Sequence, residues 1–466
     1  MEAHNGRNGA EAGSRSYVLF VSLVATLGGL LFGYDTAVIS GAIGPLIERF
    51  SLDAAWEGWT ASSALLGCVI GAAVAGALSD ALGRRKALML TAVLFLVSAV
   101  GTALPRTLTQ LIVFRIIGGI GVGAAAMTSP MYIAEISPAR IRGRMVSLNQ
   151  LAIVSGMLVV YFVNYVIALQ GDKAWAVQTG WRYMFGSEAI PAVLFLLMLF
   201  FVPESPRWLV KRGRDDQALG ILTRVGGQES ARREVAEIRA TIRQEEDSLL
   251  ELLRPGWRLV LTIGVTLAVL QQITGINVFL YYAPEIFKGM GVEDDKALLQ
   301  TILVGAANLL FTLVAIRTVD RLGRKPLMLV GASGMGVSLF AMGFAAYLQT
   351  TGLWVLLFVL TYIASFALSL GPVVWVVLSE IFPTKIRGRA MGLATVCLWC
   401  ANLVVSQTFP MIDENPWLVE RFHHGFSFWI YGFFCLITIG FVALVVPETK
   451  GRSLEEIETM WMERKS

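Results

Sequence analysis

Twelve long apolar stretches divide this chain, and they restrict its fold more than any other feature. Each is about 20 residues long, the length that an α-helix needs to cross the hydrocarbon core of a bilayer. Because 55% of the 466 residues are hydrophobic and only 15% are charged, the chain is too apolar for a soluble protein. The sequence therefore predicts an all-α membrane protein with twelve spanning helices. They are expected at Val18–Ser40, Trp59–Leu78, Ala87–Ala103, Thr109–Ile133, Val146–Ala168, Tyr183–Phe201, Leu259–Tyr282, Leu298–Val319, Leu327–Leu348, Leu353–Leu378, Met391–Phe409 and Phe426–Val446.

The two halves of the chain repeat the same short motifs in the same order. SDALGRRK returns as VDRLGRKP, AEISPARIRGR as SEIFPTKIRGR, and VPESPRW as VPETKGR. A duplicated six-helix unit in parallel orientation explains this repeat, and such halves place a substrate site between them near the membrane midplane. We expect a disordered cytoplasmic tail (1–16), two six-helix bundles (17–202 and 258–446), a cytoplasmic helical linker (203–257) and a cytoplasmic tail (447–466).

Basic residues predict the orientation of the chain in the membrane. Clusters of Lys and Arg occur in alternate loops, whereas the intervening loops carry one or two basic residues or none. Because basic residues stay preferentially on the cytoplasmic side, we expect a multi-pass inner-membrane protein with both termini in the cytoplasm. The clusters are Arg84, Arg85 and Lys86; Arg140, Arg142 and Arg144; Arg321, Arg324 and Lys325; and Lys385, Arg387 and Arg389.

Charged side chains inside the apolar spans are candidate functional groups. Asp35 lies in GGLLFGYDTAVISG and Arg115 in LIVFRIIGGIGVG. A charge at the bilayer centre costs roughly 2.5 to 3.5 kcal/mol, so it usually faces a partner or a water-filled path. Glu188, near the outer end of the sixth span, is a third candidate, and simple exposure at that boundary is an equal alternative.

The seventh span, LQQITGINVFLYYAP, carries the polar side chains of Gln271, Gln272, Asn277 and Tyr281. One straight helix cannot direct all four to one point, so Gly275 is a candidate for a break, which at membrane depth requires a cavity. Hydrogen bonding between neighbouring helices is the alternative role for such groups.

Further candidates for the same cavity are Gln150, Asn308, Trp375 and Trp399. Amides supply both donors and acceptors, and indole faces cover apolar C–H groups, so together they suit a neutral polyhydroxylated ligand. Gly371 and Pro372 predict a bend beside Trp375, because proline removes a backbone donor.

Acidic residues recur beside the basic cytoplasmic motifs in both halves. Pairs of opposite charge there could clamp helix ends and break when the cytoplasmic side opens. The alternative is that the basic residues only fix topology. The expected gating pairs are Glu135 with Arg142, Glu204 with Arg84 or Arg85, and Glu380 with Arg387 and Arg324.

An enzyme or a metal protein is not expected. The three histidines, His4, His423 and His424, lie in a tail and a loop with no nucleophile–base pair, and Cys397 and Cys400 lie in an apolar span without a nearby histidine.

The motifs SDALGRRK, MYIAEISPARIRG, VPESPRWL, QQITGIN, GPVVWVVLSEIFPTKIRG and VPETKGRSLEE resemble the signatures of the sugar porters of the major facilitator superfamily, those that carry D-xylose with a proton above all. The resemblance runs from about Tyr17 to about Trp461. It implies a twelve-helix major facilitator bundle and a sugar site formed by Phe32, Gln150, Gln271, Gln272, Asn277, Tyr281, Asn308, Trp375 and Trp399.

The resemblance also implies that Asp35 is the proton-coupling carboxylate, paired with Arg115 and assisted by Glu188. Facilitators have a neutral Asn at position 35. Met157 and Leu398 stand where xylose symporters have Gln, which could relax selectivity toward glucose or another sugar.

The sequence thus predicts import of a monosaccharide, D-xylose foremost, together with a proton by alternating access. The partners expected are the sugar, the proton and the lipid bilayer, with no nucleic acid, no cofactor and no metal, and the functional unit is expected to be a monomer. The alternatives are an uncoupled facilitative glucose or hexose uniporter of the same fold and, more remotely, a transporter-like sugar sensor.

Overall fold

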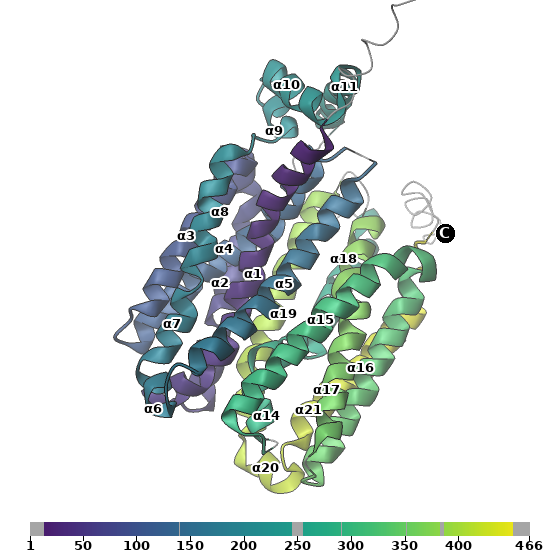
Figure 1. The fold of residues 1–466 in the computed structure, drawn as a ribbon. Helices are drawn as coiled ribbons and strands as arrows, with labels where there is room; N and C mark the ends of the chain where they lie inside the picture. Colours follow the sequence, from purple (N-terminus) through teal and green to yellow (C-terminus); the bar gives the residue numbers. More distant parts are fainter. Residues whose placement is uncertain are drawn as a thin grey trace, which may run out of the picture.

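The computed structural model describes residues 14–138, 140–244, 255–289, 291–350, 352–382 and 386–450. In these residues twelve helices are long and apolar enough to cross a membrane, which confirms the predicted number of spans. Most of the expected tails, 1–16 and 447–466, and residues 245–254 of the linker lie outside the described residues. Figure 1 shows the spans as a bundle of neighbouring rods, with the linker helices at one end.

The first half contains six spans whose starts are set by local capping. Asp53 and Thr107 accept hydrogen bonds from the backbone N–H groups of Trp56 and Gln110, so α2 and α4 begin directly after them. The sixth span is made of short pieces, and Glu188 lies at one of the junctions. The elements are α1 (Arg15–Phe50), α2 (Ala54–Leu82), α3 (Arg84–Ala103), α4 (Leu108–Ile136), α5 (Arg142–Ala168), α6 (Lys173–Trp175), the π-helical η1 (Ala176–Gly180), α7 (Trp181–Gly186), α8 (Ala189–Met198) and the 3-10 turn η2 (Leu199–Phe201).

The second half contains two broken spans. The seventh is interrupted at Gly275, whose φ of 89° lies in the left-handed region that glycine adopts readily, so the predicted break is confirmed. The tenth is interrupted at Ser369, shortly before Gly371 and Pro372. The elements are α12 (Pro255–Ile273), α13 (Ile276–Tyr281), α14 (Ala283–Gly289), α15 (Asp294–Leu322), α16 (Arg324–Tyr347), α17 (Leu353–Leu368), α18 (Leu370–Ile381), α19 (Arg387–Asp413), α20 (Pro416–Phe422) and α21 (Gly425–Leu444).

The linker forms α9 (Pro206–Lys211), α10 (Asp215–Gly226) and α11 (Gln228–Gln244), which share a small apolar core around Trp208, Leu209 and Ala218. This core is attached to the first half. Trp208 Nε1 donates to the carbonyl of Asp80 (2.9 Å), and Lys211 Nζ lies 3.0 Å from the Asp80 carboxylate. These contacts attach the linker helices to the first half, at one end of the bundle (Figure 1).

The two halves meet at the end of the bundle away from the linker. Gln407 of α19 donates to the carbonyl of Ala55 (2.9 Å) and accepts a hydrogen bond from Ser62 (3.0 Å), both in α2. These hydrogen bonds hold the two halves together and close the bundle at the far end.

Candidate functional site

The three intramembrane charges come together inside the first half. Asp35 of α1 is 2% exposed, Arg115 of α4 is 2% exposed and Glu188, between α7 and α8, is 1% exposed. Glu188 is therefore buried, and its simple exposure at the membrane boundary is excluded. The side chains of Asp35 and Glu188 lie next to each other. Two carboxyl groups so close repel when both are ionised and share a hydrogen bond only when one of them is protonated.

Arg115 lies beside the carboxyl pair without joining it directly. Its Nη2 donates to the carbonyl of Ala61 (3.2 Å), and its guanidinium lies 5.5 Å from the ring centroid of Phe185. The expected direct pair of Asp35 with Arg115 is therefore replaced in this conformation by the pair of Asp35 with Glu188. The cation still acts on Asp35 through space, because both are buried where screening is weak. Asp35, Glu188 and Arg115 thus form one titratable cluster.

The amides of the seventh span form a chain of hydrogen bonds around its break. Gln272 Nε2 donates to Gln271 Oε1 (3.3 Å), and Asn277 Nδ2 donates to Gln272 Oε1 (2.5 Å). The break places Asn277, on α13, within reach of α12, as the sequence required. Both glutamines are buried, and Asn277 is half-buried. Buried amides of this kind retain free donors and acceptors for hydroxyl groups.

The two broken spans are tied to each other. Gln271 Nε2 donates to the carbonyls of Leu370 (2.7 Å) and Gly371 (3.1 Å), at the start of α18. Tyr362 of α17 in turn donates to the carbonyl of Thr274 (2.9 Å), at the break of the seventh span. Tyr362 thus satisfies a carbonyl left over at the break of the seventh span, and Gln271 fixes the start of α18 against α12.

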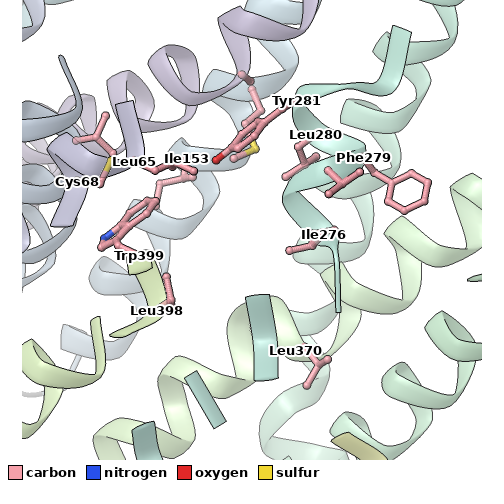
Figure 2. Packing of buried hydrophobic residues seen from close by; sticks show 14 of the residues in the cluster. Leu65, Cys68, Ile153, Ile276, Phe279, Leu280, Tyr281, Leu370, Leu398 and Trp399 are labelled. Atoms are coloured by element: carbon pink, nitrogen blue, oxygen red, sulfur yellow. The ribbon is translucent and has the colours of Figure 1, made fainter. Parts of the chain in front are cut away.

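Aromatic and apolar side chains close the region opposite the amides. Phe32 and Trp399 lie with ring centroids 5.5 Å apart, and the buried Nε1 of Trp399 has no protein partner. Figure 2 shows Trp399 on α19 and Tyr281 on α13 approaching the same region from two helices, with Leu398 next to Trp399. An indole donor left without a partner beside an aromatic face is available to a polar ligand.

Met157 and Asn308 face each other across the two halves. Asn308 Nδ2 lies 3.8 Å from Met157 Sδ, a weak acceptor, so this amide has hydrogen-bonding capacity to spare. Leu398 is also buried, next to Trp399. Gln150 and Trp375 are half-buried, and their contact with a ligand stays a prediction.

Sequence reasoning missed Asn402. Its Nδ2 donates to the hydroxyl of Tyr281 (3.4 Å), and it accepts from Ser406 (3.0 Å), so it positions a predicted site residue. An Asn in the apolar eleventh span is the same signal that identified Asn308 in the eighth. Asn149, beside Gln150, was also missed; it is buried, and its Oδ1 has no partner.

The charges at the linker end form a cluster within the first half. Arg84 Nε lies 2.9 Å from Glu135, and Glu204 accepts from the backbone N–H of Arg85 (3.1 Å). Arg142 pairs with Glu234 of the linker (3.8 Å), so the expected pair of Glu135 with Arg142 is wrong for this conformation. The reason is that the Arg84 guanidinium already occupies the space beside Glu135.

The second half contains the equivalent cluster. Arg324 Nη2 lies 2.7 Å from Glu380, as expected, and Arg387 Nε donates to the carbonyl of Phe382 (3.1 Å). The pairs of Arg84 with Glu135 and of Arg324 with Glu380 each lie within one half. Their role in gating stays a prediction.

This architecture defines a secondary transporter of the major facilitator type: two parallel six-helix halves enclose buried carboxyl groups and amide-bearing broken helices. The chain belongs to the family described as "Sugar (and other) transporter", which matches residues 21–461.

Comparison with known proteins agrees with this assignment. The chain is 51% identical to the D-xylose-proton symporter of Escherichia coli K12 and 42% identical to the arabinose-proton symporter of Bacillus subtilis, each over 96% of both chains. The fold is similar to the partially occluded inward-open structure of the xylose transporter from E. coli, with a TM-score of 0.85 and 48% identity over 94% of this chain and 100% of that one.

Proposed function

We propose that this protein imports a monosaccharide, D-xylose foremost, together with a proton by alternating access. The observation that carries this proposal is the burial of two adjacent carboxyl groups, Asp35 and Glu188, beside Arg115, where one proton can be shared between them. A uniporter has no need of a titratable pair inside an apolar bundle, where it is costly. The similarity of this chain to two proton symporters also supports coupling to a proton.

The coupling ion in this proposal is the proton, and no cofactor takes part. Arg115 remains charged at every physiological pH, whereas Asp35 and Glu188 can titrate. A fixed cation disfavours binding of a second cation such as sodium at the same place. A small change in the separation of Asp35 from Arg115 is sufficient to favour release or uptake of the proton.

The sugar is proposed to lie between the halves, against Gln271, Gln272, Asn277, Asn308 and the rings of Phe32 and Trp399, with Gln150, Tyr281 and Trp375 completing the site. Both symporters used for comparison carry pentoses by name, which supports a pentose here. Met157 and Leu398 replace two amides by apolar groups and widen the range of sugars that fit.

The proposed orientation has both termini and the linker in the cytoplasm of a multi-pass inner-membrane protein. The basic clusters at the linker end support it. In this orientation the closed far end faces the outside.

Proteoliposomes with an imposed pH gradient test the proposal. The wild-type protein should accumulate labelled D-xylose against its gradient, and Asp35→Asn should exchange labelled for unlabelled xylose without accumulating it. Asn is nearly isosteric with Asp but cannot release a proton. Accumulation by the Asp35→Asn protein would contradict this role for Asp35, and equilibration without accumulation by the wild type would identify a uniporter.

A further inference from the structure

The closed end of the bundle contains a carboxyl pair that the sugar and proton sites do not use. Glu57 lies in the first turn of α2, yet it is only 5% exposed. Its side chain lies next to that of Glu414, which directly follows α19 in the other half and is exposed to solvent. As with Asp35 and Glu188, two carboxyl groups can share a hydrogen bond only when one of them is protonated.

The charged groups nearest to this pair are acidic. Their negative charge stabilises the protonated form of the pair. Partial burial and the Asp413 carboxylate raise the pKa of Glu414. Asp413 is itself held by Ser427 (2.7 Å) and by His424 Nδ1 (3.2 Å). The titratable and charged groups around the pair are Asp53 before α2, Tyr282 directly after α13, Glu285 of α14 with its partner Lys288 (2.9 Å), Asp413 at the end of α19 and His424 before α21.

The pair lies beside a close contact between the halves. Gly58, the next residue, packs so closely against α19 that an added Cβ would lie 2.3 Å from the Gln407 carbonyl oxygen. Gln407 also makes the two hydrogen bonds to Ala55 and Ser62. Glu57 is therefore buried against Glu414 only while α2 and α19 touch. Separation of these helices must pull the two carboxyl groups apart and hydrate Glu57.

We propose that Glu57 and Glu414 form a proton-dependent latch at the outer end of the transporter. The shared proton holds α2 against α19, and its loss to the outer solution favours opening of that end. The latch rests on the proposed alternating access and orientation. Because the pair faces the same solution before and after opening, it shifts the balance between conformations and adds no transported proton.

The sign of the pH dependence follows from proton linkage. The closed state binds the shared proton more strongly than the open state, in which hydrated Glu57 has an ordinary pKa of about 4.3. Acid therefore favours the closed outer end, and rising pH favours its opening. With one proton exchanged, the closed-to-open ratio should fall by up to about tenfold for each pH unit.

Distance measurements between spin labels on the purified full-length protein test the latch without sugar or a proton gradient. Leu104→Cys and Leu348→Cys, at the ends of α3 and α16, report on the outer end, because these side chains are 70% and 64% exposed. Leu82→Cys and Leu322→Cys, at the ends of α2 and α15, report on the linker end in the same way. The background replaces the four native cysteines with Ala.

Between about pH 5 and 8, the long-distance population at the outer end should grow while the linker-end distance shortens. Glu57→Gln should remove this response, because an amide has no proton to release. Glu414→Gln should move the midpoint to lower pH, because it removes the repelling carboxylate. Two controls should keep the wild-type response: His424→Gln, the nearby histidine, and Glu293→Gln, a 76% exposed side chain in the loop before α15.

Asp35 and Glu188 are present in every variant, so their titration cannot account for a difference between variants. A wild-type pH response retained by Glu57→Gln, or lost in His424→Gln, would overturn the latch. No response in the wild type would overturn it as well. If the two label pairs move but not in opposite directions, the proposed alternating access fails, and the latch fails with it.

Discussion

The hydrogen bonds between the seventh and tenth spans predict how strongly sugar binding depends on the amide of Gln271. Gln271 is 2% exposed, and its Nε2 makes two hydrogen bonds to backbone carbonyls of the tenth span. A hydrogen bond contributes about 0.5–1.5 kcal/mol net. The loss of both bonds in Gln271→Ala should therefore weaken the interaction between the two broken spans by about 1–3 kcal/mol. If the tie orders the site for the ligand, D-xylose should bind roughly 5- to 150-fold more weakly, at about 1.4 kcal/mol per factor of ten.

Titration calorimetry of D-xylose binding to the purified protein measures this effect, and thermal unfolding reports whether the variant is folded. Gln170→Ala is the matched control, because Gln170 Nε2 also donates to a backbone carbonyl, that of Val166 (3.0 Å), but at an exposed position. Its affinity for xylose should equal that of the wild type. Unchanged affinity in folded Gln271→Ala would refute the argument that this amide organises the site.

Three further changes have outcomes that the structure predicts. Met157→Gln with Leu398→Gln should shift preference toward xylose over glucose, and an unchanged ratio of inhibition by the two sugars in a transport assay would place both side chains away from the ligand. For Glu448, burial alone would raise the pKa, but hydrogen bonds from neighbouring backbone N–H groups outweigh it and lower the pKa. Its stabilising contribution is therefore present above the unfolded pKa of about 4.3 and lost as the pH falls through the lower folded value, so the difference in thermal midpoint between the wild type and Glu448→Gln should shrink on acidification. Tyr161→Phe removes a hydrogen bond across the halves, to the carbonyl of Leu280 (2.8 Å), and should favour opening of the outer end by roughly 2- to 10-fold in spin-label distances. Tyr362→Phe, which removes an equivalent bond within one half, should not.

The spans and both breaks follow from local chemistry that a sequence displays. Hydropathy gives the spans, and Gly275 has the positive φ that its residue type suggests. The tenth span breaks at Ser369 and not at Pro372 itself, because a proline removes the hydrogen bond to the carbonyl four residues earlier. That carbonyl belongs to Leu368, where α17 ends. Pro45, Pro130 and Pro410 lie inside unbroken helices, however, so a proline marks where a break can form and does not by itself predict one.

The partners of the charged groups could not be predicted in the same way. Asp35 and Glu188 are distant in sequence, and only the packing of the sixth span against α1 brings them together. The contact of Glu57 with Glu414 requires the closed arrangement of two separate halves, which no local pattern encodes. The pairing of Arg84 with Glu135 depends in turn on the packing of the helices, which places this guanidinium next to the Glu135 carboxylate.

The reciprocal ties of the broken spans indicate where the molecule moves. A side chain of the seventh span, Gln271, binds carbonyls at the break of the tenth, and a side chain of the tenth span, Tyr362, binds the carbonyl at the break of the seventh. Separating these two spans would leave the buried amide of Gln271 and the carbonyl of Thr274 without these partners, which is costly in a bilayer. The two spans are therefore expected to move as one body. The outer end must then open along the contacts between the halves, where Tyr161 and Gln407 make hydrogen bonds and Glu57 lies next to Glu414.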